Sequence, residues 1–286
     1  MDWGMQNRCN RIFQPATGRT VMLAIDHGYF LGPTSGLEEP GTMVEPLLPY
    51  ADSLMLTRGI LRRCIPPQST NPIVLRASGG TSVLRELSGE GLTVAIEDAI
   101  RVNAAAVTMS VFVGAEGERT TLLNLAKLVD AGEQYGIPVL AVTAVGKDMK
   151  RDARYLGLAS RICAEIGAHM VKTYYCEGFE EVVRSTPVPV VIAGGKKIPE
   201  KQAVELAHAA IRAGASGVDM GRNIFQSDCP VGMIRAVRAV VHEGAGVKDA
   251  FAIYREQKEV RAAQPTLSRS SASNKAVRSA RRSQVS

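Results

Sequence analysis

A lysine enclosed by apolar residues is the sharpest candidate for chemistry in this sequence. Lys172 stands in the run HMVKTYY, between Val171 and Thr173. An enclosed amine gives up its proton more easily and can attack a carbonyl carbon to form a Schiff base. A second cation nearby, Arg76 or Lys147, would favour the neutral amine. Alternatively, Lys172 lies at a strand end and reaches water or pairs with a carboxylate. The residues alone leave both interpretations open.

Other polar residues also stand at the ends of apolar runs. Asp26 and His27 follow VMLAI, where a carboxylate could bind substrate hydroxyls and both groups could move protons. In the alternative interpretation, Asp26 caps a loop and His27 is a structural histidine. Further accessory candidates at the ends of other runs are Arg58, Arg76, Ser78 and Thr143.

Two glycine-containing segments, AGGKK and DMGRN, have the composition of phosphate-binding loops. Glycines let backbone N–H groups approach an anion, and the guanidinium of an arginine adds two parallel charge-assisted hydrogen bonds. Ordinary turns also use glycine, and Lys196 and Lys197 could be solvated charges. Two such loops in succession nevertheless predict a phosphorylated substrate, held by Gly194, Gly195, Gly221 and Arg222.

The elements that must position these residues are eight short apolar runs. Each is nearly continuous rather than alternating, as expected of strands covered on both faces in a parallel sheet. The runs are Val21–Gly28, Ser53–Gly59, Ile73–Ser78, Ala105–Val113, Val139–Ala144, His169–Tyr175, Val188–Ala193 and Gly217–Gly221.

Amphipathic segments between the runs predict helices over Thr120–Tyr135, Ala153–Gly167 and Pro199–Ala213. Eight strand–helix units close most simply into a single-domain (β/α)8 TIM barrel, whose active site lies at the C-terminal ends of the strands. A doubly wound open sheet is the competing fold. The segment after the first run, DHGYFLGP, lacks the GxGxxG pattern that would favour the open sheet.

Length and charge set the domain boundaries. The 286 residues suit one barrel of roughly 250 residues. We expect an N-terminal segment over 1–20, the catalytic barrel over 21–263 and a disordered Ser/Arg-rich tail over 264–286. This tail has five Lys and Arg residues and no acid, whereas the whole chain has a net charge of +6, so the body is nearly neutral. Nucleic-acid binding is therefore expected, if at all, only of the tail.

Composition also points away from membranes and metals. No apolar run approaches the roughly 20 residues that span a bilayer, and MDWGMQNRCNR lacks the apolar region of a signal peptide. The five cysteines are scattered without a CxxC pair, and the histidines do not cluster with them. These features predict a cytoplasmic protein with reduced thiols, no metal site and no bound cofactor.

The motifs LAIDHG, VKTYY, VIAGGKK and GASGVDMGRNIFQ together resemble the archaeal-type class I aldolases, over most of the chain before the tail. Within that family the chain looks most like the branch of thiolases that act on phosphorylated autoinducer-2, a quorum-sensing signal. The resemblance implies the barrel, the Schiff-base Lys172 and the phosphate loops. It also implies a large homo-oligomer, a decamer in related enzymes.

One departure from the family pattern bears on the reaction. The aldolases carry a tyrosine acid/base in a Tyr-Pro-Arg-Gly stretch after the fifth strand, and here the stretch is TAVG, with Thr143 at the tyrosine's place. Losing the phenol argues against ordinary aldol chemistry. The resemblance then implies transfer of the acetyl group of 3-hydroxy-5-phosphonooxypentane-2,4-dione to coenzyme A, the co-substrate, giving acetyl-CoA and dihydroxyacetone phosphate.

Three alternatives remain open at this point. A class I aldolase would cleave a phosphorylated sugar such as fructose 1,6-bisphosphate without coenzyme A. A catalytically inert sensor would bind sugar phosphates reversibly, with no adduct at Lys172. A nucleic-acid-binding protein would depend on the tail over 264–286.

Overall fold

The computed structural model describes residues 1–144 and 150–263 of the chain. Residues 145–149, with Lys147, and the predicted tail over 264–286 lie outside the described part, so the expectations about them stay predictions. Within the described ranges, none of the helices is both long enough and apolar enough to cross a membrane.

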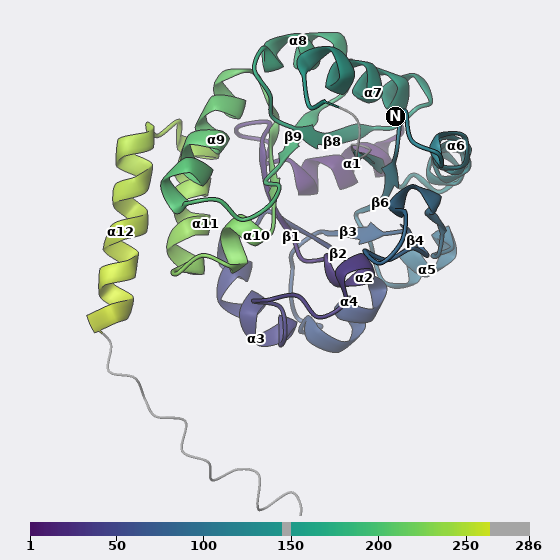
Figure 1. The fold of residues 1–286 in the computed structure, drawn as a ribbon. Helices are drawn as coiled ribbons and strands as arrows, with labels where there is room; N and C mark the ends of the chain where they lie inside the picture. Colours follow the sequence, from purple (N-terminus) through teal and green to yellow (C-terminus); the bar gives the residue numbers. More distant parts are fainter. Residues whose placement is uncertain (145–149, 264–286) are drawn as a thin grey trace, which may run out of the picture.

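Eight parallel strands form a closed barrel in the order β1-β10-β9-β8-β7-β6-β3-β2 (Figure 1). The predicted barrel and all eight predicted strands are confirmed, and the open sheet is wrong. The strands are β1 (Thr20–Ala24), β2 (Ser53–Leu56), β3 (Ile73–Arg76), β6 (Ala106–Val111), β7 (Val139–Thr143), β8 (Met170–Tyr174), β9 (Val190–Ala193) and β10 (Gly217–Met220). A separate antiparallel pair, β4 (Ser78–Gly79) and β5 (Gly91–Leu92), follows the end of β3.

Helices surround the barrel, with α12 outermost beside α11 and α9 (Figure 1). The three predicted helices correspond to α6, α7 and α9, and Pro199 precedes the first turn of α9 rather than lying in it. The α-helices are α1 (Trp3–Ile12), α2 (Gly28–Leu31), α3 (Pro40–Val44), α4 (Arg58–Cys64), α5 (Ile96–Arg101), α6 (Glu118–Tyr135), α7 (Ala153–Glu165), α8 (Phe179–Ser185), α9 (Glu200–Arg212), α10 (Arg222–Phe225), α11 (Pro230–Arg238) and α12 (Val247–Ala263). Shorter helical turns are η1 (Glu45–Tyr50), η2 (Leu87–Gly89) and η3 (Ala239–Glu243).

Successive side chains along each strand point alternately into two hydrophobic clusters. One lies between the strands and the surrounding helices, and the other fills the inside of the barrel with side chains such as Met22, Val74 and Met170. Because side chains alternate in direction along a strand, the residues two positions after Val74 and Met170 also point inward. Those residues are Arg76 and Lys172. The apolar filling of the barrel therefore gives way to polar groups at the C-terminal ends of the strands.

The N-terminal segment closes the other end of the barrel. Ile12 and Phe13, at the end of α1, are buried against the interior cluster. The helix starts at the N-cap Asp2, whose carboxylate accepts a hydrogen bond from the Met5 N–H at 2.7 Å. The segment before β1 is thus part of the barrel's hydrophobic core.

Shortening Ile12 should destabilise the fold. We expect Ile12→Ala to lower the free energy of unfolding by about 2–5 kcal/mol, because it leaves a cavity among fully buried side chains. The matched control is Trp3→Ala in the same helix, where the side chain is 80% exposed. Urea unfolding of both variants is followed by circular dichroism. Tryptophan fluorescence would not serve, because Trp3 is the single tryptophan and the control variant lacks it. Equal midpoints for the two variants would contradict the expectation.

Candidate active site

A cavity of about 390 Å³ opens at the C-terminal ends of the barrel strands. That volume lies within the range of small-molecule sites. The cavity brings together most of the residues that the sequence singled out: Asp26, His27, Arg76, Thr143, Lys172, Gly194, Gly195, Gly221 and Arg222. Residues far apart in the sequence therefore form one site.

Two of the predicted accessory residues do not line this cavity. Arg58 begins α4, and its half-exposed guanidinium pairs with the carboxylate of Asp98 at 3.2 Å. Ser78 is buried behind the cavity wall, where its hydroxyl donates to Glu90 Oε2 at 2.6 Å. Arg58 has a structural partner outside the site, while Ser78 supports a wall residue.

The amine of Lys172 lies inside the barrel, and its Nζ is 2.9 Å from Oδ2 of Asp219. Burial raises the pKa of the Asp219 carboxyl above its ordinary value, although Lys172 acts against that shift. Arg76, one of the two cations expected near Lys172, lines the same cavity and is paired with Asp26. The sequence analysis missed Asp219, although a charged residue inside the run GVDMG was the available signal.

Asp26 and Arg76 form a second buried ion pair. The Nε and Nη2 of Arg76 donate to Oδ2 of Asp26 at 2.9 and 2.7 Å. Burial alone would raise the pKa of the Asp26 carboxyl, but Arg76, His27 and Lys172 together hold it below its ordinary value. Asp26 is therefore a carboxylate fixed in orientation rather than a loop cap.

His27 is a neutral imidazole at the edge of the cavity. Burial, assisted by Lys172 and Arg222, lowers its pKa to about 4, against the opposing effect of Asp26. Its Nδ1 is buried and makes no hydrogen bond within the described residues, and it lies 3.9 Å from Oδ1 of Asp26. Within the described residues this ring nitrogen is therefore buried without a hydrogen-bond partner.

The predicted phosphate loops lie side by side after β9 and β10. A side chain at Gly221 would place a Cβ 2.4 Å from the carbonyl oxygen of Ala24 and from Cε1 of His27, so only glycine fits. Arg222 lines the cavity, and its Nε is buried without a hydrogen-bond partner in the described part of the chain. An anion at this position would supply that partner.

Asn223 ties the two loops together. Its Nδ2 donates to the carbonyl of Gly194 at 2.6 Å, and its Oδ1 accepts the N–H of Ile198 at 2.9 Å. Lys196 lines the cavity, whereas Lys197 pairs with Glu200 at 2.6 Å. The loop after β9 is therefore held against the loop after β10.

Thr143 does not present a free hydroxyl in place of the family tyrosine. Its Oγ1 donates to Oγ1 of Thr173 at 2.8 Å and lies 3.3 Å from the carbonyl of Lys172. Three polar residues that the sequence analysis did not single out, Tyr29, Glu90 and Ser110, line the wall near Arg76.

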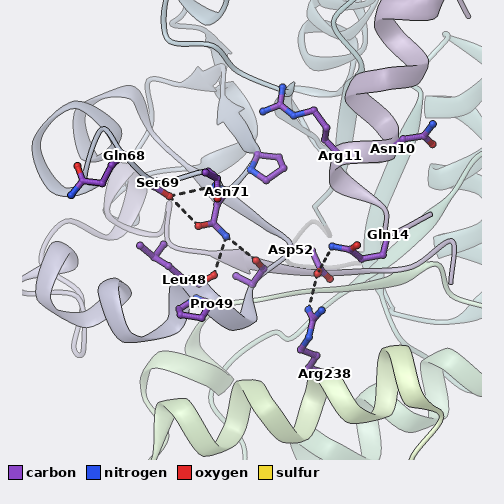
Figure 2. Close-up of a pocket in the computed structure, with 13 residues that line it drawn as sticks. Asn10, Arg11, Gln14, Leu48, Pro49, Asp52, Gln68, Ser69, Asn71 and Arg238 are labelled. Carbon is purple, nitrogen blue, oxygen red and sulfur yellow. Dashed lines mark hydrogen bonds and ion pairs between the residues drawn. The ribbon is translucent and has the colours of Figure 1, made fainter. Parts of the chain in front are cut away.

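A second hollow lies at the opposite end of the barrel, around Asp52 (Figure 2). The Asp52 carboxylate accepts hydrogen bonds from Gln14 at 3.0 Å and Arg238 at 2.7 Å, and it contacts His242 at 2.7 Å. The amide of Asn71 is likewise bonded to the backbone (Figure 2). These groups hold loops together, and the candidate active site is the cavity at the C-terminal ends of the strands.

Comparison with known proteins gives matches over most of the chain. The sequence model of the DeoC/LacD family aldolases matches residues 20–227. The chain is 58% identical over 260 residues to a 3-hydroxy-5-phosphonooxypentane-2,4-dione thiolase of Enterobacter sp. (strain 638), covering 91% of this chain and 88% of the relative. It is 56% identical over 260 residues to the protein of the same name in Escherichia coli K12, covering 91% and 89%.

Solved structures show the same fold. An archaeal fructose 1,6-bisphosphate aldolase superposes with a TM-score of 0.74 at 25% identity, covering 84% of this chain and 100% of the other. A Schiff-base-forming fructose-1,6-bisphosphate aldolase superposes equally well at 25% identity, covering 83% and 99%. The resemblance to the class I aldolases is confirmed.

The neutral state of His27 should make the fold sensitive to acid. The unfolded chain takes up a proton on this histidine near pH 6.5, whereas the folded protein does so only near the lowered pKa of about 4. Above pH 6.5, this histidine therefore does not reduce the free energy of unfolding. As the pH falls towards 4, its effect lowers that free energy. Between pH 7 and 5, we expect the wild type to lose about 2 kcal/mol more unfolding free energy than His27→Gln. Urea titrations at both pH values test this, and parallel losses in the two proteins would contradict it.

Proposed function

The chain belongs to the DeoC/LacD aldolase family, and we propose that this enzyme is a thiolase that transfers the acetyl group of 3-hydroxy-5-phosphonooxypentane-2,4-dione to coenzyme A. The second product is dihydroxyacetone phosphate. The observation that carries the proposal is the buried amine of Lys172, beside Asp219 and in one cavity with the Gly221–Arg222 loop. Relatives at 56–58% identity bear the name of this activity.

The first step is formation of a Schiff base. Asp219 lies 2.9 Å from Lys172 and, with its raised pKa, takes up the proton that the ammonium must lose. The amine then attacks the ketone nearer the phosphate, C4 of the dione. Asp26 and His27 serve the proton transfers that let water leave the carbinolamine. The resulting iminium is an electron sink.

The second step breaks the carbon–carbon bond. The sulfur of coenzyme A attacks the acetyl carbonyl, C2, and the C2–C3 electrons move into the iminium to give an enamine on Lys172. Acetyl-CoA leaves. Protonation of the enamine at C3 and hydrolysis of the iminium release dihydroxyacetone phosphate and restore the amine.

The loops after β9 and β10 orient the substrate by its phosphate. We assign this contact to the backbone of Gly194, Gly195 and Gly221 and to the guanidinium of Arg222. The buried Nε of Arg222, unpaired within the described residues, supports the assignment. A phosphate fixed there holds the dione in the same cavity as Lys172.

An aldolase acting on a phosphorylated sugar such as fructose 1,6-bisphosphate is the second candidate. The structural likeness to fructose 1,6-bisphosphate aldolases favours it. Against it, Thr143 has no phenol that could exchange a proton with an aldehyde-derived hydroxyl. Its own hydroxyl is bonded to Thr173. Cleavage that proceeds at full rate without coenzyme A would establish the aldolase instead.

We further propose that the enzyme acts in the cytoplasm as a homo-oligomer, in the breakdown of the quorum-sensing signal autoinducer-2. A cytoplasmic site accords with the need for coenzyme A and with cysteines that form no disulfide in the described residues. The oligomer follows from the resemblance to the class I aldolases, in which rings of subunits occur. Sedimentation would measure the subunit number directly.

Replacing Lys172 should abolish the covalent chemistry. We expect Lys172→Met to lose acetyl-CoA production, and wild-type protein to gain a borohydride-reduced adduct with dihydroxyacetone phosphate on the Lys172 peptide. The matched control is Lys197→Met, because Lys197 is paired with Glu200 away from the cavity lining. Peptide mass spectrometry and an acetyl-CoA assay read the result. Full activity in Lys172→Met would overturn the mechanism.

Replacing Arg222 should weaken substrate binding more than turnover. Arg222→Gln removes a charge-assisted hydrogen bond worth about 1.5–3 kcal/mol, so KM for the phosphorylated dione should rise about 10- to 100-fold. Steady-state kinetics with the dephosphorylated dione provide the comparison, since that substrate lacks the group that Arg222 would hold. An unchanged KM for the phosphorylated dione would exclude this role.

A further inference from the structure

One buried carboxylate at the cavity wall has no task in the steps above. Glu90 lies between η2 and β5, on the segment that pairs with β4 beyond the end of β3. It is 1% exposed and lines the cavity. Burying a carboxylate is costly unless hydrogen-bond partners surround it.

Hydroxyl groups surround this carboxylate. Tyr29 donates to Oε1 of Glu90 at 2.6 Å, and Ser78 donates to Oε2 at 2.6 Å. Both oxygens of the Glu90 carboxyl group therefore accept a hydrogen bond from a hydroxyl group. Within the described residues it forms no ion pair, unlike Asp26 with Arg76 and Asp219 with Lys172. Glu90 is thus the carboxylate of this cavity that can gain a proton without breaking an ion pair.

A directed chain of hydrogen bonds leads to it. Arginine can only donate, so Nη1 of Arg76 donates to Oγ of Ser110 at 3.1 Å. The Ser110 hydroxyl lies 3.2 Å from the Tyr29 hydroxyl, which in turn donates to Glu90. Each donor therefore points towards Glu90, and a proton that arrives on the Tyr29 oxygen displaces the phenolic proton onto the carboxylate.

Tyr29 keeps its own proton at rest. Burial raises the pKa of its phenol, and Glu90 raises it further, although the guanidinium of Arg76, 5.0 Å from the ring centre, acts in the opposite direction. Tyr29 is therefore a neutral donor–acceptor between the cavity and Glu90, and not a standing phenolate.

We propose that Tyr29 and Glu90 form the proton relay of the thiolysis step, carrying the thiol proton of coenzyme A to the carbon that the acetyl group leaves. This inference rests on the proposed function. As the sulfur–carbon bond forms, the thiol proton passes to the Tyr29 oxygen and the phenolic proton to Glu90. After the C2–C3 bond breaks, C3 of the enamine takes a proton from Tyr29, and Glu90 returns its proton to the phenol. The relay ends as it began, with no external acid or base consumed.

The relay also supplies an acid/base group, which Thr143 does not provide. The hydroxyl of Thr143 is bonded to Thr173 on β8, whereas Tyr29 follows β1 and Glu90 precedes β5. The acid/base group would thus have moved to another part of the cavity wall. Tyr29 is the catalytic residue of the pair, and Glu90 acts through it.

The test isolates the carbon-protonation step, run in reverse and without coenzyme A. Dihydroxyacetone phosphate in D2O forms the iminium on Lys172, and loss of a hydroxymethyl proton then exchanges hydrogen for deuterium, which NMR detects. We expect Tyr29→Phe and Glu90→Gln each to slow exchange about 100-fold or more. Borohydride should trap the Lys172 adduct in both variants as in the wild type. The double variant should be no slower than either single one, because the two residues act as a unit.

The control variant is Asn124→Ala. Asn124 donates to the backbone carbonyl of Glu90 at 3.5 Å, so this change loosens the same segment without touching the carboxylate. Its exchange rate should stay within about twofold of wild type.

The outcomes are distinguishable. Normal exchange in Tyr29→Phe, with the adduct present, would overturn the relay and leave the Schiff base intact. Loss of the adduct in both variants would also overturn it, by assigning the pair to iminium formation. No adduct in the wild type would overturn the proposed function itself, and the relay with it.

Discussion

The structure depends on the pairing of charges inside the barrel. Two ion pairs, Asp26 with Arg76 and Lys172 with Asp219, lie where water is largely excluded. Removing one partner would leave an uncompensated buried charge, which costs several kcal/mol. Each pair spans one intervening strand. Asp26 follows β1 and meets Arg76 of β3 across β2, and Lys172 of β8 meets its partner on β10 across β9. Each pair therefore depends on the register of three adjacent strands of the barrel.

Close backbone packing between the first and last strands maintains this register. A Cβ at Gly217 would lie 2.1 Å from the carbonyl oxygen of Thr20, so a glycine is required where β10 meets β1. The neighbouring residue pairs bring Asp219 to the level of Met22. Closure of the barrel thus places the carboxylate at the height from which it reaches Lys172. The loop of Gly221 and Arg222, for which we propose phosphate binding, follows directly in the chain.

The strands and much of the site could be predicted from the sequence because both depend on local patterns. Near-continuous apolar runs mark strands covered on two faces, and polar residues at their ends mark the open end of the barrel. Arg58 shows the limit of that rule, since it stands at a strand end but begins α4 and turns to Asp98. Glu90 lay beyond prediction, because its segment has no regular pattern and its role depends on Tyr29, sixty-one residues away.

The N-terminal helix has a consequence for the way ligands reach the site. Ile12 and Phe13 fill the end of the barrel opposite the cavity, so within the described residues the way to Lys172 leads past the loops that follow the strands. A ligand that enters and a product that leaves must therefore pass the same loops. A helix remote from the chemistry, through its position alone, decides from which side the site is reached.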